Sequence, residues 1–317
     1  MPTLTYRDAL NQALREEMQR DPDVFLMGEE VGVYQGAYKV SRGLLDEFGP
    51  MRVVDTPITE LGFAGVGIGA AMVGLRPVIE FMTWNFALLA IDQLVNNAAK
   101  MRYMSNGQVG VPMVVRGPGG AALQLGAQHS QAFESWYAHI PGLKIVAAAT
   151  IDDAHGMLGA ALRDPNPVLV FEYPALFETK GEVVSAEVDL SSSKIMRTGS
   201  RVTLVTYGAC LFKTLQAAEE VDGEVIDLRS LRPLDLAPVL SSIRKTRRAV
   251  IVDEGWRSGG LAAEVMARIM EQAFYDLDAP VARVCREEVP MPYAKHLEEA
   301  ALPQPEKVVA AVKGLFG

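Results

Sequence analysis

The chain has 317 residues, of which 49% are hydrophobic and 22% charged, and its formal net charge is −9. This length suits one large or two medium domains with a substantial core, and the composition is that of a globular protein. The negative charge argues against a general nucleic-acid binder, which needs basic side chains along the phosphate backbone.

Three further features predict a soluble intracellular protein that binds neither nucleic acid nor a membrane. Cys210 and Cys285 lie far apart without CxxC spacing, which argues against a disulfide framework or a cysteine zinc site. The N-terminus has neither an apolar signal core nor an Arg-rich transit pattern. The longest uncharged apolar run, residues 61–75, is shorter than the ~20 residues of a membrane-spanning helix.

The first part of the chain alternates predicted helices with apolar strands. A helix is expected over residues 6–20, because Thr5 can cap it and its apolar residues share one face. Further predicted strands are 24–27, 53–54, 77–81, 111–115, 144–148 and 168–171, and further predicted helices follow residue 60 and span 87–103 and 152–163. Such alternation predicts an α/β fold with a mostly parallel sheet covered on both faces.

The pattern lapses over residues 173–200, where a serine run and scattered charges indicate a linker. It then resumes, with predicted strands at 202–206, 224–228, 249–252 and 281–284 and helices at 211–220, 260–273 and 307–315. We therefore expect two α/β domains, residues 1–185 and residues 186–317.

The most distinctive stretch is DTPITELGFAGVGIGAA, residues 55–71. Its glycine- and alanine-rich run carries no charge, and Glu60 stands just before it, in the first turn of the expected helix. An apolar surrounding would raise the pKa of this carboxyl, as a general acid or base needs near neutral pH. The alternative is that Glu60 simply complements a helix N-terminus.

Gly65, Gly67 and Ala70 match the G-x-G-x-x-A dinucleotide pattern. That pattern requires its first glycine in the turn directly after a strand. Here the glycines fall inside the expected helix, so close helix packing explains them better than nucleotide binding does.

Other candidates are a histidine and an aromatic cluster. His129 follows a glycine-rich loop, where function often lies, although an exposed or locally satisfied ring is the alternative. Phe81, Trp84 and Phe86 follow a parallel strand, where open α/β sheets bind ligands, but core packing explains them almost equally well. We find no P-loop and no obvious motif for a diphosphate with Mg²⁺.

Taken together, six separated motifs resemble the β subunit of the decarboxylase component of 2-oxo acid dehydrogenase complexes, with the pyruvate dehydrogenases closest. The motifs are Asp55-Thr56-Pro57-Ile58-Thr59-Glu60, Glu80-Phe81-Met82-Thr83-Trp84-Asn85-Phe86, Ala90-Ile91-Asp92-Gln93, Arg116-Gly117-Pro118, His129-Ser130-Gln131 and Val289-Pro290-Met291-Pro292-Tyr293-Ala294-Lys295.

The resemblance implies a transketolase-like fold, with a thiamine diphosphate pyrimidine-binding domain followed by a transketolase C-terminal domain. It implies an enzyme that is active only with an α subunit, in an α2β2 heterotetramer. The cofactors would be thiamine diphosphate, Mg²⁺ held mainly by the α subunit, and K⁺. The enzyme would decarboxylate pyruvate and reductively acetylate lipoyl groups of the acyltransferase core. The alternatives are an acetoin or branched-chain 2-oxo acid dehydrogenase subunit, or a noncatalytic scaffold.

The resemblance also implies residue roles. Glu60 would bond the N1′ nitrogen of the cofactor's pyrimidine, Phe86 would pack on that ring, and Ile58 and Met82 would line the same pocket. His129 would serve acyl transfer, and Glu288 would lie where the acyltransferase docks. K⁺ would be held, largely through backbone carbonyls, by Met113, Ala161, Leu162, Asp164 and Asn166. A bacterial chain would be cytoplasmic, and a processed eukaryotic chain would lie in the mitochondrial matrix.

Overall fold

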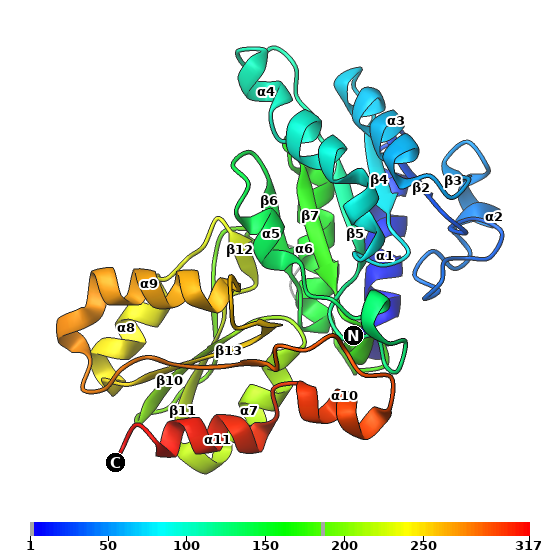
Figure 1. Cartoon of the computed structure of the whole chain (residues 1–317). Coiled ribbons are helices and arrows are strands. Elements are labelled where there is room, and N and C mark those ends of the chain that lie inside the picture. Colours follow the sequence, from blue (N-terminus) through cyan, green and yellow to red (C-terminus); the bar gives the residue numbers. More distant parts are fainter. Residues whose placement is uncertain (1–2, 185–187) are drawn as a thin grey trace. The chain divides into compact units, whose positions relative to one another are not determined.

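Alternating buried strands and amphipathic helices build two α/β units in the computed structural model, which describes residues 3–184 and 188–317 (Figure 1). Unit 1 holds the described residues up to Gly119 and from Trp136 to Leu190. Unit 2 holds Gly120–Ser135 and Ser191–Gly317. The predicted boundary between residues 185 and 186 lies outside the described residues.

The core of unit 1 is a parallel sheet, in which the strands of this unit follow the order β6-β7-β5-β4-β2-β3. Strands β2, β5 and β7 are buried along their whole length and β4 and β6 nearly so, as expected where helices cover both faces. The predicted parallel arrangement is confirmed. The strands are β2 (Val24–Gly28), β3 (Val53–Asp55), β4 (Arg76–Glu80), β5 (Val114–Pro118), β6 (Lys144–Ala147) and β7 (Val168–Glu172).

Capping residues begin two helices of unit 1 that pack against each other, α1 (Tyr6–Arg20) and α6 (Ile151–Arg163). The Thr5 hydroxyl accepts a hydrogen bond from the Asp8 N–H at 3.1 Å, which confirms the predicted cap. The other elements of this unit are α2 (Leu44–Phe48), α3 (Glu60–Met72), the 3-10 helix Pro174–Leu176 and the antiparallel pair β1 (Thr3–Thr5) and β8 (Lys180–Glu182).

Helix α3 approaches β4 closely at one glycine, Gly67. A Cβ at Gly67 would lie 2.6 Å from Ile79 Cδ1, whereas a Cβ at Gly69 would meet nothing within 4 Å. These glycines lie inside the helix, so the structure agrees with close packing rather than a nucleotide-binding turn.

The single helix predicted over residues 87–103 is wrong. The segment divides into the 3-10 helix Phe86–Ala90, the π-helix Gln93–Ala98 and α4 (Met101–Met104). A Cβ at Gly142 would lie 2.0 Å from the Ala99 carbonyl oxygen, so another segment packs directly on the helix backbone here. Tertiary packing here outweighs the helical periodicity of the sequence, and the wider turn of the π-helix Gln93–Ala98 accommodates the close contact.

Unit 2 has a five-stranded sheet of order β14-β13-β10-β11-β9, in which only the edge strand β9 runs antiparallel to its neighbour. Figure 1 shows α7 and α11 on one face of this sheet and α8 and α9 on the other. The strands are β9 (Lys194–Arg197), β10 (Val202–Thr206), β11 (Gly223–Asp227), β13 (Ala249–Trp256) and β14 (Ala282–Arg286), and the four helices are α7 (Cys210–Val221), α8 (Ala237–Thr246), α9 (Leu261–Ala273) and α11 (Pro305–Lys313).

Several short elements escaped prediction. The stretch predicted as a linker, residues 173–200, contains strands β8 and β9, because a few polar residues suffice to pair with an existing edge. Helices α8 and α10 (Lys295–Ala301) and strand β12 (Ser230–Arg232) were not predicted either. The remaining short elements are α5 (Glu134–Ala138) and the 3-10 helices Ala127–His129 and Phe274–Asp276. Within the described residues, no helix has the length and apolar character that crossing a membrane requires.

The two glycines of α3 give a matched test of this packing. Gly67→Ala should lower the free energy of unfolding by about 1–3 kcal/mol, because its methyl group overlaps the buried Ile79 side chain. Gly69→Ala should raise it by up to about 1 kcal/mol through helix propensity alone. Urea denaturation followed by circular dichroism measures both, and equal effects would contradict the packing described here.

Candidate active site

Three parallel strands bring acidic residues to one edge of the unit 1 sheet. Gly28 at the end of β2 pairs with Asp55 on β3 and with Glu80 on β4. A Cβ at Gly28 would lie 2.5 Å from the Glu80 carbonyl oxygen, so only glycine allows this approach. The carboxyl ends of parallel strands are where open α/β sheets bind ligands.

Asp55 fixes the loop that follows β2. Its carboxylate oxygens accept hydrogen bonds from the N–H groups of Gly32 at 2.6 Å and Val33 at 3.0 Å. Thr56 N–H in turn donates to the Gly28 carbonyl at 3.0 Å. The loop that begins with Glu29 is therefore tied to the chain that leads into α3.

Glu29 and Glu60 form a carboxylate pair at this edge. Glu60 lies in the first turn of α3 and is 5% exposed, and Glu29, directly after β2, is 7% exposed. Burial first, and then the charge and side-chain hydrogen bonding of Glu60, together raise the pKa of Glu29 to about 7. Such a pair can hold a proton near neutral pH, as an acid–base site requires.

Glu29 is the residue that sequence reasoning missed. The sequence argument expected a desolvated carboxyl at Glu60, and the structure confirms that Glu60 is buried and adds the raised pKa of Glu29 beside it. The available signal was the position of Glu29, directly after a buried parallel strand. Its Oε1 has no hydrogen-bond partner among the described residues, which leaves a buried acceptor for a ligand.

A buried ion triad stands on the neighbouring strands. Arg116 on β5 donates through Nε and Nη2 to the two carboxylate oxygens of Glu172 on β7, each at 2.5 Å. Its Nη1 donates to Glu80 on β4. Burial raises the pKa of Glu80, while the charge of Arg116 opposes that rise. The triad is structural, because all its members point at one another.

The aromatic cluster predicted at this edge divides between core and site. Phe81 and Trp84 are fully buried, and Trp84 stacks on Phe171 with ring centroids 4.1 Å apart. These two residues are core. Phe86 and Met82 are half-buried in the segment after β4, and Ile58, which precedes α3, is 83% exposed.

His129 belongs to unit 2, so its geometry is described there. It ends the 3-10 helix Ala127–His129 and is half-buried. Its neighbour Ser130 is fully buried and accepts a hydrogen bond from the Ala122 N–H at 3.2 Å. His129 is therefore neither fully exposed nor fully buried, and its role stays a prediction.

Four of the five residues predicted to hold K⁺ cluster around the end of α6. Arg76 Nη1 donates to the carbonyls of Leu162 at 2.9 Å and Asp164 at 3.4 Å, and the Ala161 carbonyl accepts from the Asp164 N–H at 3.2 Å. The fifth, Met113, accepts from the Val168 N–H at 3.0 Å. Each carbonyl keeps a second lone pair, and the K⁺ site stays a prediction.

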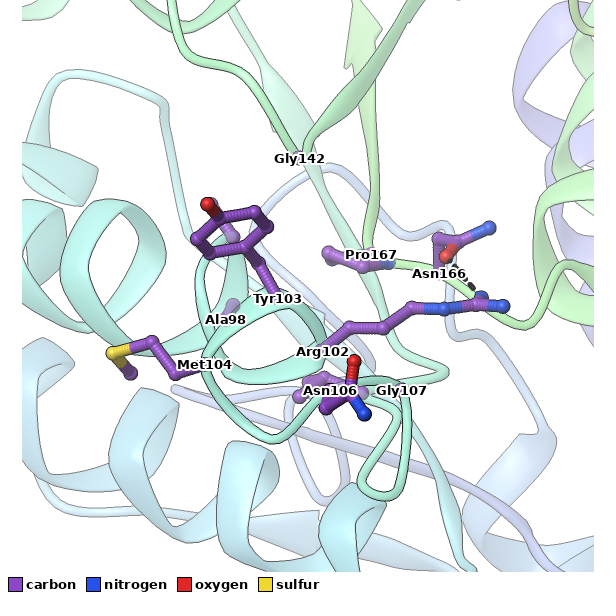
Figure 2. Close-up of a pocket in the computed structure, with 11 residues that line it drawn as sticks. Ala98, Arg102, Tyr103, Met104, Asn106, Gly107, Gly142, Asn166 and Pro167 are labelled. Carbon is purple, nitrogen blue, oxygen red and sulfur yellow. Dashed lines mark hydrogen bonds between the residues drawn. The ribbon is translucent and has the colours of Figure 1, made fainter.

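Asn166, the last of these residues, also lines a cavity of about 700 Å³ in unit 1. Figure 2 shows Arg102 reaching across to Asn166, to whose Oδ1 it donates at 2.7 Å. Tyr103 and Met104 stand on the same short helix, α4. The Asn166 side-chain oxygen is thus already engaged with Arg102 through one hydrogen bond.

Glu288, predicted to dock a partner, is exposed just after β14 in unit 2. It accepts a hydrogen bond from the Ser258 N–H at 2.7 Å, and hydrogen bonds from Ser258 lower the pKa of the carboxyl. The residue is therefore anionic and at the surface, and its docking role stays a prediction.

The raised pKa of Glu29 gives stability a distinctive pH dependence. Between 4.5, the ordinary glutamate value, and about 7, the folded chain binds more protons at Glu29 than the unfolded chain does. This residue therefore lowers the free energy of unfolding as pH rises through that window, by at most about 3 kcal/mol in all, since solvent screening reduces the full value. Relative to wild type, Glu29→Gln should gain this amount between about pH 5 and about pH 8, measured by urea denaturation. The exposed Glu219→Gln should show no such gain, and a flat difference for Glu29→Gln would refute the pairing.

The chain matches two domain families, described as "Transketolase, pyrimidine binding domain" over residues 2–177 and "Transketolase, C-terminal domain" over residues 191–308. A split gene transketolase, solved as an inactive beta4 tetramer, superposes with a TM-score of 0.81 at 22% identity, covering 98% of each chain. The predicted transketolase-like fold is confirmed.

Curated relatives define the family more narrowly. Pyruvate dehydrogenase E1 component subunit beta of Rhizobium meliloti (strain 1021) is 53% identical over 323 residues, which cover 99% of this chain and 70% of the relative. The mitochondrial subunit beta-1 of Oryza sativa subsp. japonica is 52% identical over 321 residues, which cover 98% of this chain and 86% of the relative. With identity of this level along nearly its whole length, the chain belongs to the family of pyruvate dehydrogenase E1 component β subunits.

Proposed function

We propose that this chain is the β subunit of a pyruvate dehydrogenase that decarboxylates pyruvate and reductively acetylates lipoyl groups of the acyltransferase core. The names of its relatives support pyruvate as substrate and do not favour the acetoin, branched-chain or scaffold alternatives. The observation that carries the chemistry is the buried Glu29–Glu60 pair at the carboxyl edge of the sheet.

The family implies thiamine diphosphate, and the residues present fit its pyrimidine half. When bound, this cofactor supplies the nucleophilic carbon and the electron sink that decarboxylation of a 2-oxo acid needs. The pyrimidine ring nitrogen is a hydrogen-bond acceptor, so a protonated carboxyl can donate to it. The Glu29–Glu60 pair can hold a proton near neutral pH, because the pKa of Glu29 is raised to about 7. Phe86 and Met82 are half-buried and Ile58 is exposed, so all three retain surface for contact with a ring.

Each residue of the site then has one task. Glu60 would bond the pyrimidine N1′ nitrogen, and Glu29 beside it would hold or supply the proton that this contact needs. Phe86, Met82 and Ile58 would orient the ring and exclude water. His129 provides a half-buried imidazole that can donate or accept a proton during acyl transfer.

The remaining cofactor assignments follow the family. We propose that Mg²⁺ is held mainly by the α subunit. We also propose that K⁺ is held near the end of α6 by Met113, Ala161, Leu162, Asp164 and Asn166.

An apolar surface on α3 supports an assembly partner. Val66 is 59% exposed, and Leu61 and Met72 on the same helix are exposed as well. Such a surface is typical of a protein interface. We propose that it serves the α2β2 heterotetramer, and that Glu288 attracts the basic face of a lipoyl-bearing acyltransferase.

The relatives include bacterial and mitochondrial proteins, so we propose the cytoplasm for a bacterial chain and the mitochondrial matrix for a processed eukaryotic one.

The proton relay is tested by Glu60→Gln in the complex reconstituted with an α subunit, thiamine diphosphate and Mg²⁺. Pyruvate-dependent reduction of an artificial electron acceptor should fall by about 10²-fold or more, while the cofactor still binds in calorimetry. Glu219→Gln, an exposed control, should keep wild-type activity. Full activity of Glu60→Gln would mean that the proton-relay role of Glu60 is wrongly assigned. A preference for acetoin or for branched-chain 2-oxo acids would contradict the assignment of pyruvate as the substrate.

The interface proposal is tested by Val66→Lys. A buried lysine at an interface is unpaired and costly, so this variant should fail to assemble with the α subunit while its own circular dichroism stays unchanged. Tyr275→Lys, at an exposed aromatic of unit 2, is the control and should assemble. Sedimentation velocity of each mixture decides, and a heterotetramer containing Val66→Lys would place the interface elsewhere.

A further inference from the structure

Side chains elsewhere in unit 2 hold backbone groups of the segment Gly120–Ser135, here called the His129 loop. The Ala121 N–H donates to Glu254 Oε1 at 2.5 Å, and the Gln124 N–H donates to Glu298 Oε2 at 2.7 Å. The Ser130 carbonyl accepts from Arg286 Nη1 at 2.6 Å. The last contact is adjacent to His129.

The three side chains that grip the loop come from separate elements and are all buried. Glu254 lies on β13, Arg286 ends β14, and Glu298 lies on α10. Arg286 is 2% exposed, and its guanidinium lies 5.0 Å from the centroid of the Trp256 ring. Charged groups at this depth are costly unless paired, so their burial against one loop marks a specific contact.

The loop itself is strained where it is held. Leu123 and Gln124 both have positive φ angles, 55° and 69°, and neither is glycine. Such residues persist only when the surroundings impose them. The Gln124 N–H contact to Glu298 lies within this strained pair. Without its three anchors, the loop would relax to other conformations.

We infer that Arg286, together with Glu254 and Glu298, positions the His129 loop for acyl transfer to the lipoyl group. This inference rests on the proposed function and deepens it. Arg286 is a positioning residue, since it touches the Ser130 carbonyl and acts on the reaction through the adjacent His129. Its Nε and Nη2 atoms have no hydrogen-bond partner in the described part of the chain, so the Ser130 contact is the one hydrogen bond found there for this cation.

The test separates the two half-reactions in the reconstituted α-containing complex. Arg286→Met should lower kcat/KM for acetylation of a free lipoyl domain by about 10²-fold, since a displacement of about 1 Å costs that much. It should leave pyruvate-dependent reduction of the artificial acceptor within about twofold. Arg286→Lys keeps a donor and should recover part of the lost acetylation. Arg283→Met, on the same strand but bonded to the Arg257 carbonyl, is the matched control.

Two further measurements keep the inference falsifiable. Combined with His129→Ala, the Arg286→Met change should add no further loss, because both act through one group. Should Arg286→Met fail to fold, Glu298→Ala removes a different anchor from a helix that tolerates alanine, and the same split is expected. Equal losses in both half-reactions, or additive losses with His129→Ala, would overturn the positioning role.

Failure of the proposed function is recognised separately. Hydrogen exchange of the Ala121 and Gln124 amides needs no activity. It should accelerate in Arg286→Met and not in Arg283→Met, and unchanged exchange would overturn the inference even in an active enzyme. A wild-type complex that acetylates no lipoyl domain would instead refute the proposed function.

Discussion

A single buried guanidinium sets the geometry of the acidic edge in unit 1. Arg116 stands on β5, between the two strands that carry its partners, Glu172 on β7 and Glu80 on β4. Breaking a buried pair of this kind costs about 3–5 kcal/mol, so the three strand ends cannot slide past one another. The backbone of Glu80 in turn meets Gly28. The position of Glu29, directly after Gly28, therefore depends on the ion triad of the neighbouring strands.

Most of the helices and strands could be predicted from the sequence, because the strongest sequence patterns depend only on neighbouring residues. Buried parallel strands are continuous apolar runs, and α1 has both a capping threonine and an apolar face. The burial of Glu60 could be predicted for a similar reason, since a lone carboxylate beside a chargeless glycine-rich helix is visible in the sequence itself.

What escaped prediction depends on contacts between distant segments. Glu29 became important only when the fold brought it beside Glu60. The helix over residues 87–103 is interrupted because a loop near Gly142 packs on its backbone. The His129 loop is held by Glu254, Arg286 and Glu298, which follow it by more than a hundred residues in the chain. Periodicity and propensity contain no information about any of these three contacts.

The membership of the His129 loop has a consequence for the order in which the chain folds. During synthesis the N-terminal part leaves the ribosome first, so the strands of unit 1 can assemble as soon as β7 has appeared. Ala121 must wait, because the buried cluster that receives it contains Met291, Ala301 and Leu302. For much of its synthesis the nascent chain can therefore have a folded unit 1 sheet while the His129 loop still lacks its contacts in unit 2. Folding of unit 2 is therefore complete only when the His129 loop, which was synthesised much earlier, packs against residues near the end of the chain.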